Sequence, residues 1–389
     1  MSDLNVDETR ATAFALESLL AALASNAAQR DKQGGTAKHE RDLIRDSGLL
    51  TLSIPHEFGG GGADWVEIFA IIRRMAAVDS SLAHLFAFHH LMIATLQFFG
   101  TADQTRRAME KTVRENCFWG NAVNPRDSRL RLRRQGESYR LDGAKSFCSG
   151  ASDSDMLVVS ALDEQEKLKI AVIPTRRGGI RIHDDWDNMG QRQTDSGSMS
   201  FDEVEVSDDE LLVSPGPLGS PFAALRPCLA QLILVAIYVG LARGALVSAI
   251  AYVRELPSDG AARIGGDPFT LHTAGELWAQ VCGAEALVDR AVQSFQRGWT
   301  RGDAITPQER GAIAIDVAIA KVASARAALD VSSRMFDIMG ARATTARAGL
   351  DRFWRNARTH TLHDPLDHKL KEVGDFALNG AYPTPSFYS

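Results

Sequence analysis

The sequence has few cysteines and no paired cysteine spacing. Only four cysteines occur among 389 residues, at positions 117, 148, 228 and 282. They lie too far apart for a zinc site or a disulfide scaffold, which favours a reducing compartment. The N-terminal segment carries acidic residues where a secretory signal would carry bases and an apolar run. We therefore expect a cytoplasmic protein.

The sequence also lacks an excess of positive charge and a long apolar run. Its 43 Lys and Arg residues against 49 Asp and Glu give a net charge of -6, without a basic stripe, so we expect neither nucleic acid nor membrane as a partner. The longest uncharged apolar stretch, residues 228–242, is shorter than the roughly 18 residues of a membrane span and predicts a buried helix. A hydrophobic content of 45% predicts a large core.

Several common catalytic motifs are missing. No Gly-x-Gly-x-x-Gly opens a helix, and no Walker loop, His-Glu-x-x-His or Gly-x-Ser-x-Gly is present. These absences argue against dinucleotide binding of the Rossmann type, phosphoryl transfer, zinc proteolysis and α/β-hydrolase chemistry. His360 and His363 could form half of a metal site, but no third ligand is evident, so we expect no metal.

The apolar pattern changes twice along the chain. Helical spacing runs from residue 6 to about 115, with breaks at 46–48 and 59–62 and a helix that Asp79 caps and Gly100 ends. Short β-rich runs follow to about residue 213, including a hairpin with its turn at Asp142-Gly143. Helical spacing then returns. The pattern predicts an α+β protein with a helical domain at 1–115, a β domain at 116–214 and a helical domain at 215–389.

Candidate functional residues gather in two histidine groups and two polar stretches. The histidine groups lie at 84–90 and 360–368, and the apolar neighbours of His89 favour a satisfied core residue. Residues 144–150 place an aromatic ring, a thiol and a hydroxyl side by side. Residues 186–198 are unusually polar for a connection between strands and could hold an anionic or heteroaromatic ligand. A strand end and a hydrated turn are the simpler interpretations.

These two stretches, in this order between helical halves, resemble the acyl-CoA dehydrogenase superfamily and, more narrowly, its dibenzothiophene monooxygenase group. The matching segments are Gly-Leu-Leu-x-Leu-x-Ile-Pro at 48–55, Gly-Ala-Asp-Trp at 62–65, Ser-Leu-x-His-Leu-Phe at 81–86, Phe-Cys-Ser-Gly at 147–150, Arg-Gln-Thr-Asp-Ser-Gly-Ser at 192–198, Ile-Met-Gly-Ala-Arg at 338–342 and the segment 355–365. The resemblance implies an acyl-CoA dehydrogenase-like fold with an N-terminal helical domain, a middle β-barrel-like domain and a C-terminal four-helix bundle.

The resemblance also implies a function. Members of the group take reduced FMN (FMNH2) from a separate NAD(P)H-dependent flavin reductase, form a C4a-hydroperoxyflavin with molecular oxygen, and transfer one oxygen atom to a substrate. The expected substrate is small, aromatic and sulfur-containing, similar to dibenzothiophene. A homotetramer is implied as well, and we expect the C-terminal tail, residues 378–389, to dock on a neighbouring subunit.

The resemblance assigns residues to this chemistry. They are His89, Asn121, Ser149 and His363 in the catalytic set, Phe147, Trp186, Gly340 and Arg342 at the cofactor, and Phe147 and His360 in the substrate pocket. Neutral polar side chains can hold a flavin hydroperoxide in a dry pocket, and histidine can supply a proton. A second phosphate-binding arginine of the group is missing from the loop at 255–260, and Arg254 and Arg263 are the alternatives.

Three other functions remain open. An acyl-CoA dehydrogenase needs a carboxylate base, whereas this chain has His363-Asp364-Pro365 where the usual glutamate would lie. An N-hydroxylase or indole-type oxygenase of the same fold would differ only in its substrate. A flavin-binding protein without catalytic activity is disfavoured because the polar set is complete.

Overall fold

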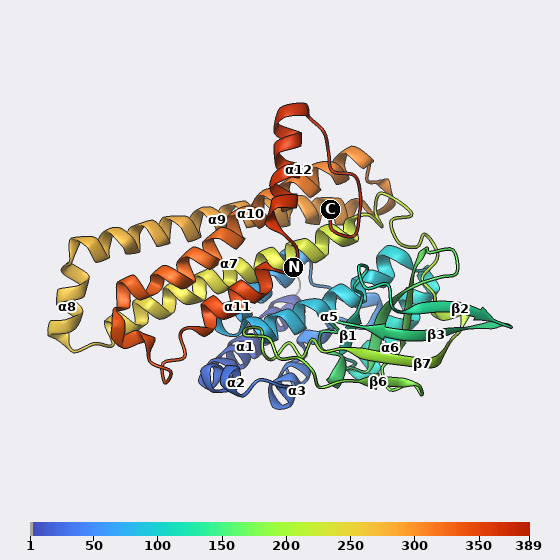
Figure 1. Ribbon diagram of the computed structural model, residues 1–389, viewed down its shortest axis with the longest axis horizontal. Coiled ribbons are helices and arrows are strands. Elements are labelled where there is room, and N and C mark those ends of the chain that lie inside the picture. The colour runs from blue at the N-terminus through green and yellow to red at the C-terminus, as the bar shows by residue number, and fades with distance from the viewer. Residues whose placement is uncertain (1–2) are drawn as a thin grey trace.

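The computed structural model describes residues 3–389, with side chains from residue 13 onward. Helices come first along the chain, a sheet follows, and long helices complete the fold (Figure 1). The predicted order of helices, β domain and helices is confirmed. The cavity described below lies where these three parts meet.

The N-terminal part consists of helices whose ends follow local signals. They are α1 (Asp3–Ser25), α2 (Ala27–Gln33), α3 (Lys38–Asp46), α4 (Trp65–Val78), α5 (Ser80–Phe99) and α6 (Ala102–Glu115). The Asp79 carboxylate accepts hydrogen bonds from the backbone N–H groups of Ser81 and Leu82, at 3.0 and 3.1 Å, and so caps α5. Gly100 follows the last residue of α5. Both predicted ends of this helix are confirmed.

The middle part is one mixed sheet of seven strands. They are β1 (Trp119–Ala122), β2 (Arg131–Gln135), β3 (Ser138–Lys145), β4 (Met156–Leu162), β5 (Leu168–Pro174), β6 (Ile180–Ile182) and β7 (Met199–Val206). The strand order is β1-β4-β2-β3-β7-β6, and β5 pairs with β4. The parallel pairing of β1 with β4 carries β1 to the side of the sheet that faces α5.

The predicted position of the hairpin turn is wrong. The turn between β2 and β3 consists of residues 136–137, because residues 135 and 138 pair with each other. Asp142 and Gly143 lie inside β3, where its register with β7 shifts. Gly143 has a φ of 126°, and a Cβ there would lie 2.1 Å from the Arg129 carbonyl oxygen. The glycine therefore permits a bulge and a close backbone approach.

The C-terminal part consists of α7 (Leu225–Arg254), α8 (Ser258–Gly266), α9 (Pro268–Arg301), α10 (Pro307–Met339), α11 (Arg352–Thr361) and α12 (Leu366–Asn379). Helices α7, α9 and α10 pack along one another, and α8 joins α7 to α9 at the far end of this group (Figure 1). Thr306 begins α10 with a capping box, in which its hydroxyl accepts from the Glu309 N–H.

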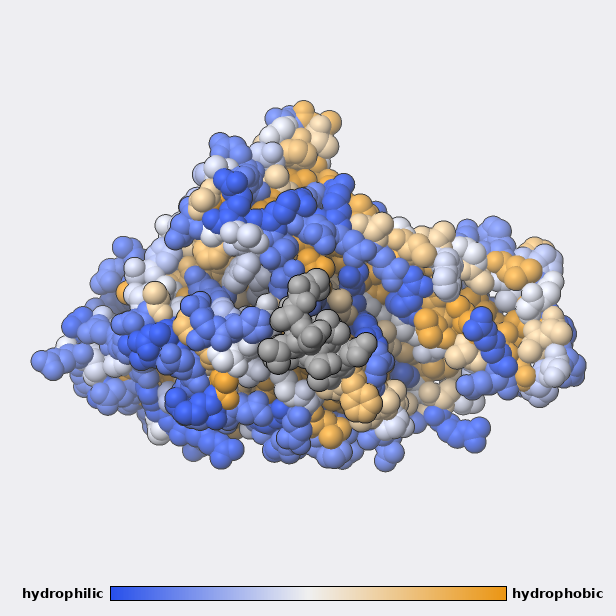
Figure 2. All heavy atoms as spheres, turned by 180° about the vertical axis from the view of Figure 1, so that it is seen from behind, coloured by the Kyte–Doolittle hydropathy of each residue, from blue (hydrophilic) through white to orange (hydrophobic). Residues whose placement is uncertain are grey.

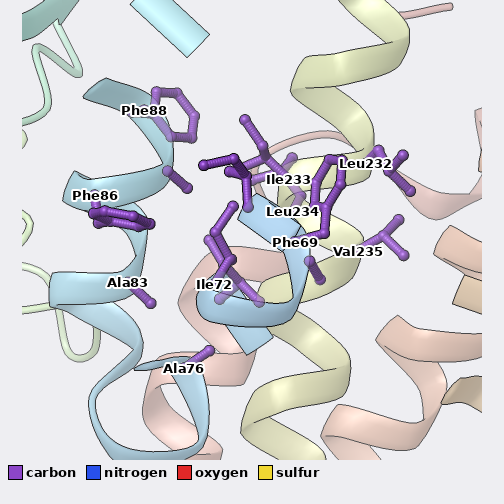
Figure 3. Close-up of a cluster of buried hydrophobic side chains, with 14 of the residues drawn as sticks. Phe69, Ile72, Ala76, Ala83, Phe86, Phe88, Leu232, Ile233, Leu234 and Val235 are labelled. Carbon is purple, nitrogen blue, oxygen red and sulfur yellow. The ribbon is translucent and has the colours of Figure 1, made fainter. Parts of the chain in front are cut away.

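Helices α4, α5 and α7 form the centre of the core. Figure 3 shows Phe69 and Ile72 of α4 between Phe86 of α5 and Leu232 of α7, and all four belong to one hydrophobic cluster. Both α5 and α7 are long and apolar enough to cross a membrane, but 94% and 78% of their most apolar windows are buried inside the protein. The apolar stretch 228–242 is thus a buried helix, as predicted.

The C-terminal tail packs on its own subunit. The guanidinium of Arg310 on α10 hydrogen-bonds the terminal oxygen of Ser389, and the ammonium of Lys369 on α12 binds the Tyr388 carbonyl. The ring of Tyr382 stacks on that of Phe376, with centroids 5.2 Å apart. Cations of the same chain therefore hold the last residues of the tail, and its docking on a neighbouring subunit stays a prediction.

Candidate active site

A cavity of about 740 Å³ lies between the sheet and the helices. Its walls come from α5, from the segments that follow β1, β3 and β6, from α7, from the end of α11 and from the tail. This volume is within the range of small-molecule sites, roughly 300–1,000 Å³. All three parts of the chain and both polar stretches identified in the sequence contribute to it.

Two histidines and a serine form a hydrogen-bonded row on one wall. His84 of α5 lies 3.1 Å from His360 of α11, measured from Nδ1 to Nε2, and its Nε2 lies 3.0 Å from the Ser149 hydroxyl. Burial lowers the pKa of His84 to about 3, with a smaller contribution from His363, and burial also lowers the pKa of His360 well below its ordinary value. Both rings are therefore neutral at physiological pH, and each has one donor and one acceptor.

The row continues into the polar loop before β7. Ser149 lies 2.8 Å from the Ser196 hydroxyl, Ser196 donates to the Thr194 hydroxyl at 2.8 Å, and Thr194 donates to the Gln191 carbonyl at 2.9 Å. Because the Ser196 proton points to Thr194, Ser149 is the donor to Ser196. Ser149 then accepts from Nε2–H of His84.

The direction of this row fixes the tautomers of both histidines. His84 donates from Nε2, so its Nδ1 accepts from Nε2–H of His360, and Nδ1 of His360 carries a free lone pair. This nitrogen is buried and has no partner among the described residues, and the same holds for Gln191 Oε1 and Thr359 Oγ1. All three residues line the cavity. Buried polar atoms without partners are rare in native proteins, so these atoms indicate a polar ligand.

The structure brings most of the predicted site residues together. The cavity wall includes Asn121, Phe147, Ser149, Trp186, His360 and His363. The rings of Phe147 and Trp186 meet edge to face with centroids 6.1 Å apart, and the Trp186 indole N–H donates to the Gln191 carbonyl at 2.8 Å. The Asn121 side chain accepts from the Val123 N–H at 2.9 Å.

His89 does not line the cavity. Its Nε2–H donates to the Leu50 carbonyl at 2.7 Å, and its Nδ1 accepts from the Trp119 N–H at 3.1 Å, so both nitrogens are used by backbone groups. Burial lowers its pKa to about 4. The prediction that His89 faces the reactive pocket is wrong, and the histidine of α5 that does so is His84. His84 lies in the segment Ser-Leu-x-His-Leu-Phe at 81–86, which carries part of the family resemblance. This segment was the feature of the sequence that could have identified His84.

Four other predicted residues lie outside the cavity wall. Gly340 follows α10, and Arg342 lies in the short helical turn after it, and both are exposed. Arg254 at the end of α7 and Arg263 in α8 are exposed as well. None of the four lines the cavity of the described chain. Their roles in binding a flavin phosphate stay predictions.

A buried ion pair lies behind His363. The Lys321 ammonium is 2.5 Å from the Asp364 carboxylate and also donates to the side-chain oxygen of Gln231, which lines the cavity. Burial would raise the pKa of Asp364, but the hydrogen bond from His363 and the charge of Lys321 outweigh burial and hold this pKa well below its usual value. Burial lowers the pKa of Lys321 to about 8 against the opposing effect of Asp364.

Comparison with known families gives a consistent match along the chain. The family models for the N-terminal, middle and C-terminal domains of acyl-CoA dehydrogenase match residues 8–116, 120–204 and 232–368. The chain is 48% identical to a "Probable FMNH2-dependent monooxygenase SfnC" of Pseudomonas putida, over 99% of both chains. It is 39% identical to a dibenzothiophene monooxygenase of Mycolicibacterium goodii, over 93% of this chain and 92% of that protein.

Two solved structures share the whole fold. The methanesulfinate monooxygenase MsuC from Pseudomonas fluorescens superposes with a TM-score of 0.94, at 47% identity and with full coverage of both chains. The FMN-bound TdsC from Paenibacillus sp. A11-2 superposes with a TM-score of 0.92, at 40% identity, over 98% of this chain and 100% of that one. The fold predicted from the sequence is therefore confirmed.

Proposed function

The chain belongs to the acyl-CoA dehydrogenase family and to its FMNH2-dependent monooxygenases, and we propose that it oxygenates the sulfur atom of a small organosulfur substrate. One atom of O2 forms a bond to sulfur, and the other leaves as water. FMNH2 supplies two electrons and two protons and becomes FMN, while the sulfur is oxidised by two electrons. The observation that carries the proposal is the neutral row from His360 through His84 to Ser149, which ends in an unpartnered acceptor on the cavity wall.

The residues of the cavity fit a flavin. FMN, when bound, supplies the reaction of reduced flavin with oxygen. Phe147 and Trp186 offer aromatic surface for packing against a heteroaromatic ring, and Gln191 and Thr359 each present a buried polar atom without a protein partner. An isoalloxazine ring carries hydrogen-bonding groups along one edge and apolar carbon along the other, which matches this combination.

The protein's own groups divide the remaining work. Phe88, Leu91 and Leu234 line the cavity with apolar surface and exclude water from it. Ser149 and Asn121 place hydroxyl and amide groups beside the reacting region. His84 is neutral and hydrogen-bonded at both nitrogens, so it can pass a proton along the row without leaving a charge in the dry pocket.

The acyl-CoA dehydrogenase alternative lacks a suitable base. Asp364 is 3% exposed, is bound by Lys321 and does not line the cavity. Asp187 does line the cavity, but its side chain is exposed to solvent and lies outside the dry part of the pocket. An N-hydroxylase or indole-type oxygenase would use the same residues and differ only in its substrate. These alternatives are therefore distinguished by which substrate becomes oxygenated.

Two partners belong to the proposal. A separate NAD(P)H-dependent reductase supplies FMNH2, and a homotetramer covers exposed apolar surface. Apolar side chains gather over the α8 and α9 region in Figure 2, where Phe269 is 81% exposed and Trp278 is 49% exposed. In such an assembly, Gly340 and Arg342 would reach the flavin of a neighbouring subunit. The cytoplasmic location remains a prediction.

Isotopic labelling tests the proposed function. The protein is mixed with chemically reduced FMN and 18O2 in the presence of dibenzothiophene, methanesulfinate, indole or a primary amine, and the products are analysed by mass spectrometry. We expect one labelled oxygen in a sulfur product and one FMNH2 consumed for each product formed. Label in the amine or indole alone would favour the alternative oxygenases, and anaerobic bleaching of bound FMN by an acyl-CoA would favour the dehydrogenase.

A further inference from the structure

Arg226 at the start of α7 is a buried cation on the cavity wall without an anionic partner. The residue is 5% exposed and lines the cavity. Its Nε donates to the Thr95 hydroxyl at 3.3 Å, and this is its single side-chain hydrogen bond to the described residues. No carboxylate among the described side chains pairs with it. The two terminal nitrogens of the guanidinium therefore lack protein acceptors.

Other buried arginines of this chain differ from Arg226. Arg30 pairs with Asp79 at 2.5 Å, and Arg41 pairs with Asp153 at 3.2 Å. Arg310 binds the terminal oxygen of Ser389 and also donates to a backbone carbonyl at 3.1 Å. Burying a charge without a counter-charge is strongly unfavourable. An unpaired guanidinium beside a cavity therefore indicates that a ligand supplies the missing negative charge.

The position of Arg226 separates this cation from the histidine row. On α5, His84, Phe88, Leu91 and Thr95 follow helical spacing, and the first three line the cavity. Thr95 comes eleven residues after His84 (95 − 84), which corresponds to about 16 Å along the helix at 1.5 Å per residue. On α7, Ala230 and Leu234 follow Arg226 at four-residue intervals and also line the cavity. The cavity thus has a polar neutral end, an apolar middle and a cationic end.

We propose that Arg226 binds the anionic group of the substrate, and that the substrate is therefore an organosulfur anion. A guanidinium can hold an oxyanion through two parallel hydrogen bonds, and the apolar middle of the cavity fits the carbon skeleton. The inference rests on the proposed sulfur oxygenation for its reaction. A neutral thiophene would leave the charge of Arg226 unpaired.

Two kinds of molecule carry this chemistry. In a sulfinate the reacting sulfur bears the charge, and RSO2⁻, O2 and FMNH2 give RSO3⁻, water and FMN. In a thioether with a carboxylate, the charge is remote from the sulfur, and the same co-reactants give a sulfoxide, water and FMN. Each reaction forms one S–O bond, breaks the O–O bond and moves two electrons from FMNH2 and two from sulfur to oxygen.

Calorimetry on the flavin-free protein tests the inference without turnover. The probes are methanesulfinate, 4-(methylthio)butanoate and dimethyl sulfone, the last a neutral molecule of similar size to the first. We expect the wild type to bind one of the two anions more tightly than dimethyl sulfone. Arg226→Gln should weaken the binding of that anion about a hundredfold, as loss of a charge-assisted pair does. Arg226→Lys keeps part of this affinity. Arg243 lies on the same helix but pairs with Glu285, so Arg243→Gln is the matched control for the change in net charge. We expect this variant to bind the anion as the wild type does.

Three further measurements make the outcome decisive. The Arg226→Gln protein should unfold at the same temperature as the wild type or higher, because the substitution removes an unpaired buried charge. The KM of this variant for the anion should rise by the same factor as the dissociation constant measured by calorimetry. Its affinity for FMN should stay unchanged. Equal anion binding by wild type and Arg226→Gln, no anion binding by the wild type, or a parallel loss of FMN affinity overturns the inference.

The same experiment separates this inference from the proposed function. Anion binding that depends on Arg226, together with no oxygenated product from FMNH2 and O2, supports the role of Arg226 and contradicts sulfur oxygenation. Labelled sulfonate or sulfoxide formed equally well by Arg226→Gln supports sulfur oxygenation and contradicts the role of Arg226.

Discussion

Two histidines on one helix show what separates a structural buried histidine from one in a functional site. His84 and His89 both lie on α5, at 5% and 0% exposure, and burial lowers the pKa of both, to about 3 and about 4. His89 bonds the Leu50 carbonyl and the Trp119 N–H, both backbone groups. His84 bonds two side chains that line the cavity. Burial and a shifted pKa are thus shared, and the hydrogen-bond partners make the difference.

The arginines repeat this difference. Arg41 is buried and binds the Gly150 carbonyl at 2.9 Å and the Asp153 carboxylate, so it joins the N-terminal helices to the loop after β3. Arg226 is buried and has one neutral partner, Thr95. A buried cation whose counter-charge comes from the protein can hold elements of the fold together, whereas one without a counter-charge on a cavity wall is available to an anionic ligand.

The largest effect should come from His84→Gln. The substitution interrupts proton transfer along the row, and because Ser149 and His360 line the cavity, water there can replace a hydrogen bond that the glutamine does not make. We expect kcat/KM for sulfur oxygenation to fall by about 10²–10⁴, the usual contribution of a general acid or base, with little change in unfolding free energy. Steady-state product formation and urea unfolding measure the two quantities. A variant that is less stable but fully active would place His84 with the structural histidines.

The matched substitution His89→Gln should have the opposite profile. It disturbs the bonds to the Leu50 carbonyl and the Trp119 N–H, and each buried group left unpaired costs about 1–3 kcal/mol. We expect the unfolding free energy to fall by an amount of this size, and the activity per folded molecule to stay near that of the wild type. Loss of activity at unchanged stability would contradict the structural role of His89.

The pH dependence of stability should fail to separate the two histidines. Their pKa values in the folded protein lie below the unfolded value of about 6.5, so as the pH falls below about 6.5 the unfolded chain takes up protons first and stability decreases. Each histidine contributes about 1.4 kcal/mol per pH unit down to its folded pKa. Either Gln substitution should therefore reduce the slope of unfolding free energy between about pH 6 and pH 5 by one proton. An unchanged slope in either variant would show that the histidine is not buried neutral.

Local patterns predicted much of the fold. The cap at Asp79, the end at Gly100 and the strand runs depend on neighbouring residues, and they agree with the structure. Gly143 misled the prediction because a glycine in a bulge and a glycine in a turn both need an unusual backbone. The contact between the tail and Arg310 was unpredictable for another reason, since Arg310 and Ser389 are 79 residues apart in the sequence.

The choice between His84 and His89 needed tertiary information. Nearly every residue of α5 is buried, so the sequence contains no polar face that would show which side of the helix meets the cavity. The role of Arg226 was hidden for a similar reason. It lies in an apolar helix, and its partner Thr95 is 131 residues away. The resemblance identified six residues of the cavity wall, and only the structure identified the roles of His84 and Arg226.

The different roles of His84 and His89 can be tested by measuring the hydrogen peroxide released per FMNH2 oxidised, with substrate present, for His84→Gln, His89→Gln and the wild type. We expect His84→Gln to release most of the oxygen that it consumes as hydrogen peroxide, and folded His89→Gln to form oxygenated product as efficiently as the wild type. Peroxide release by His89→Gln together with intact product formation by His84→Gln would contradict these roles.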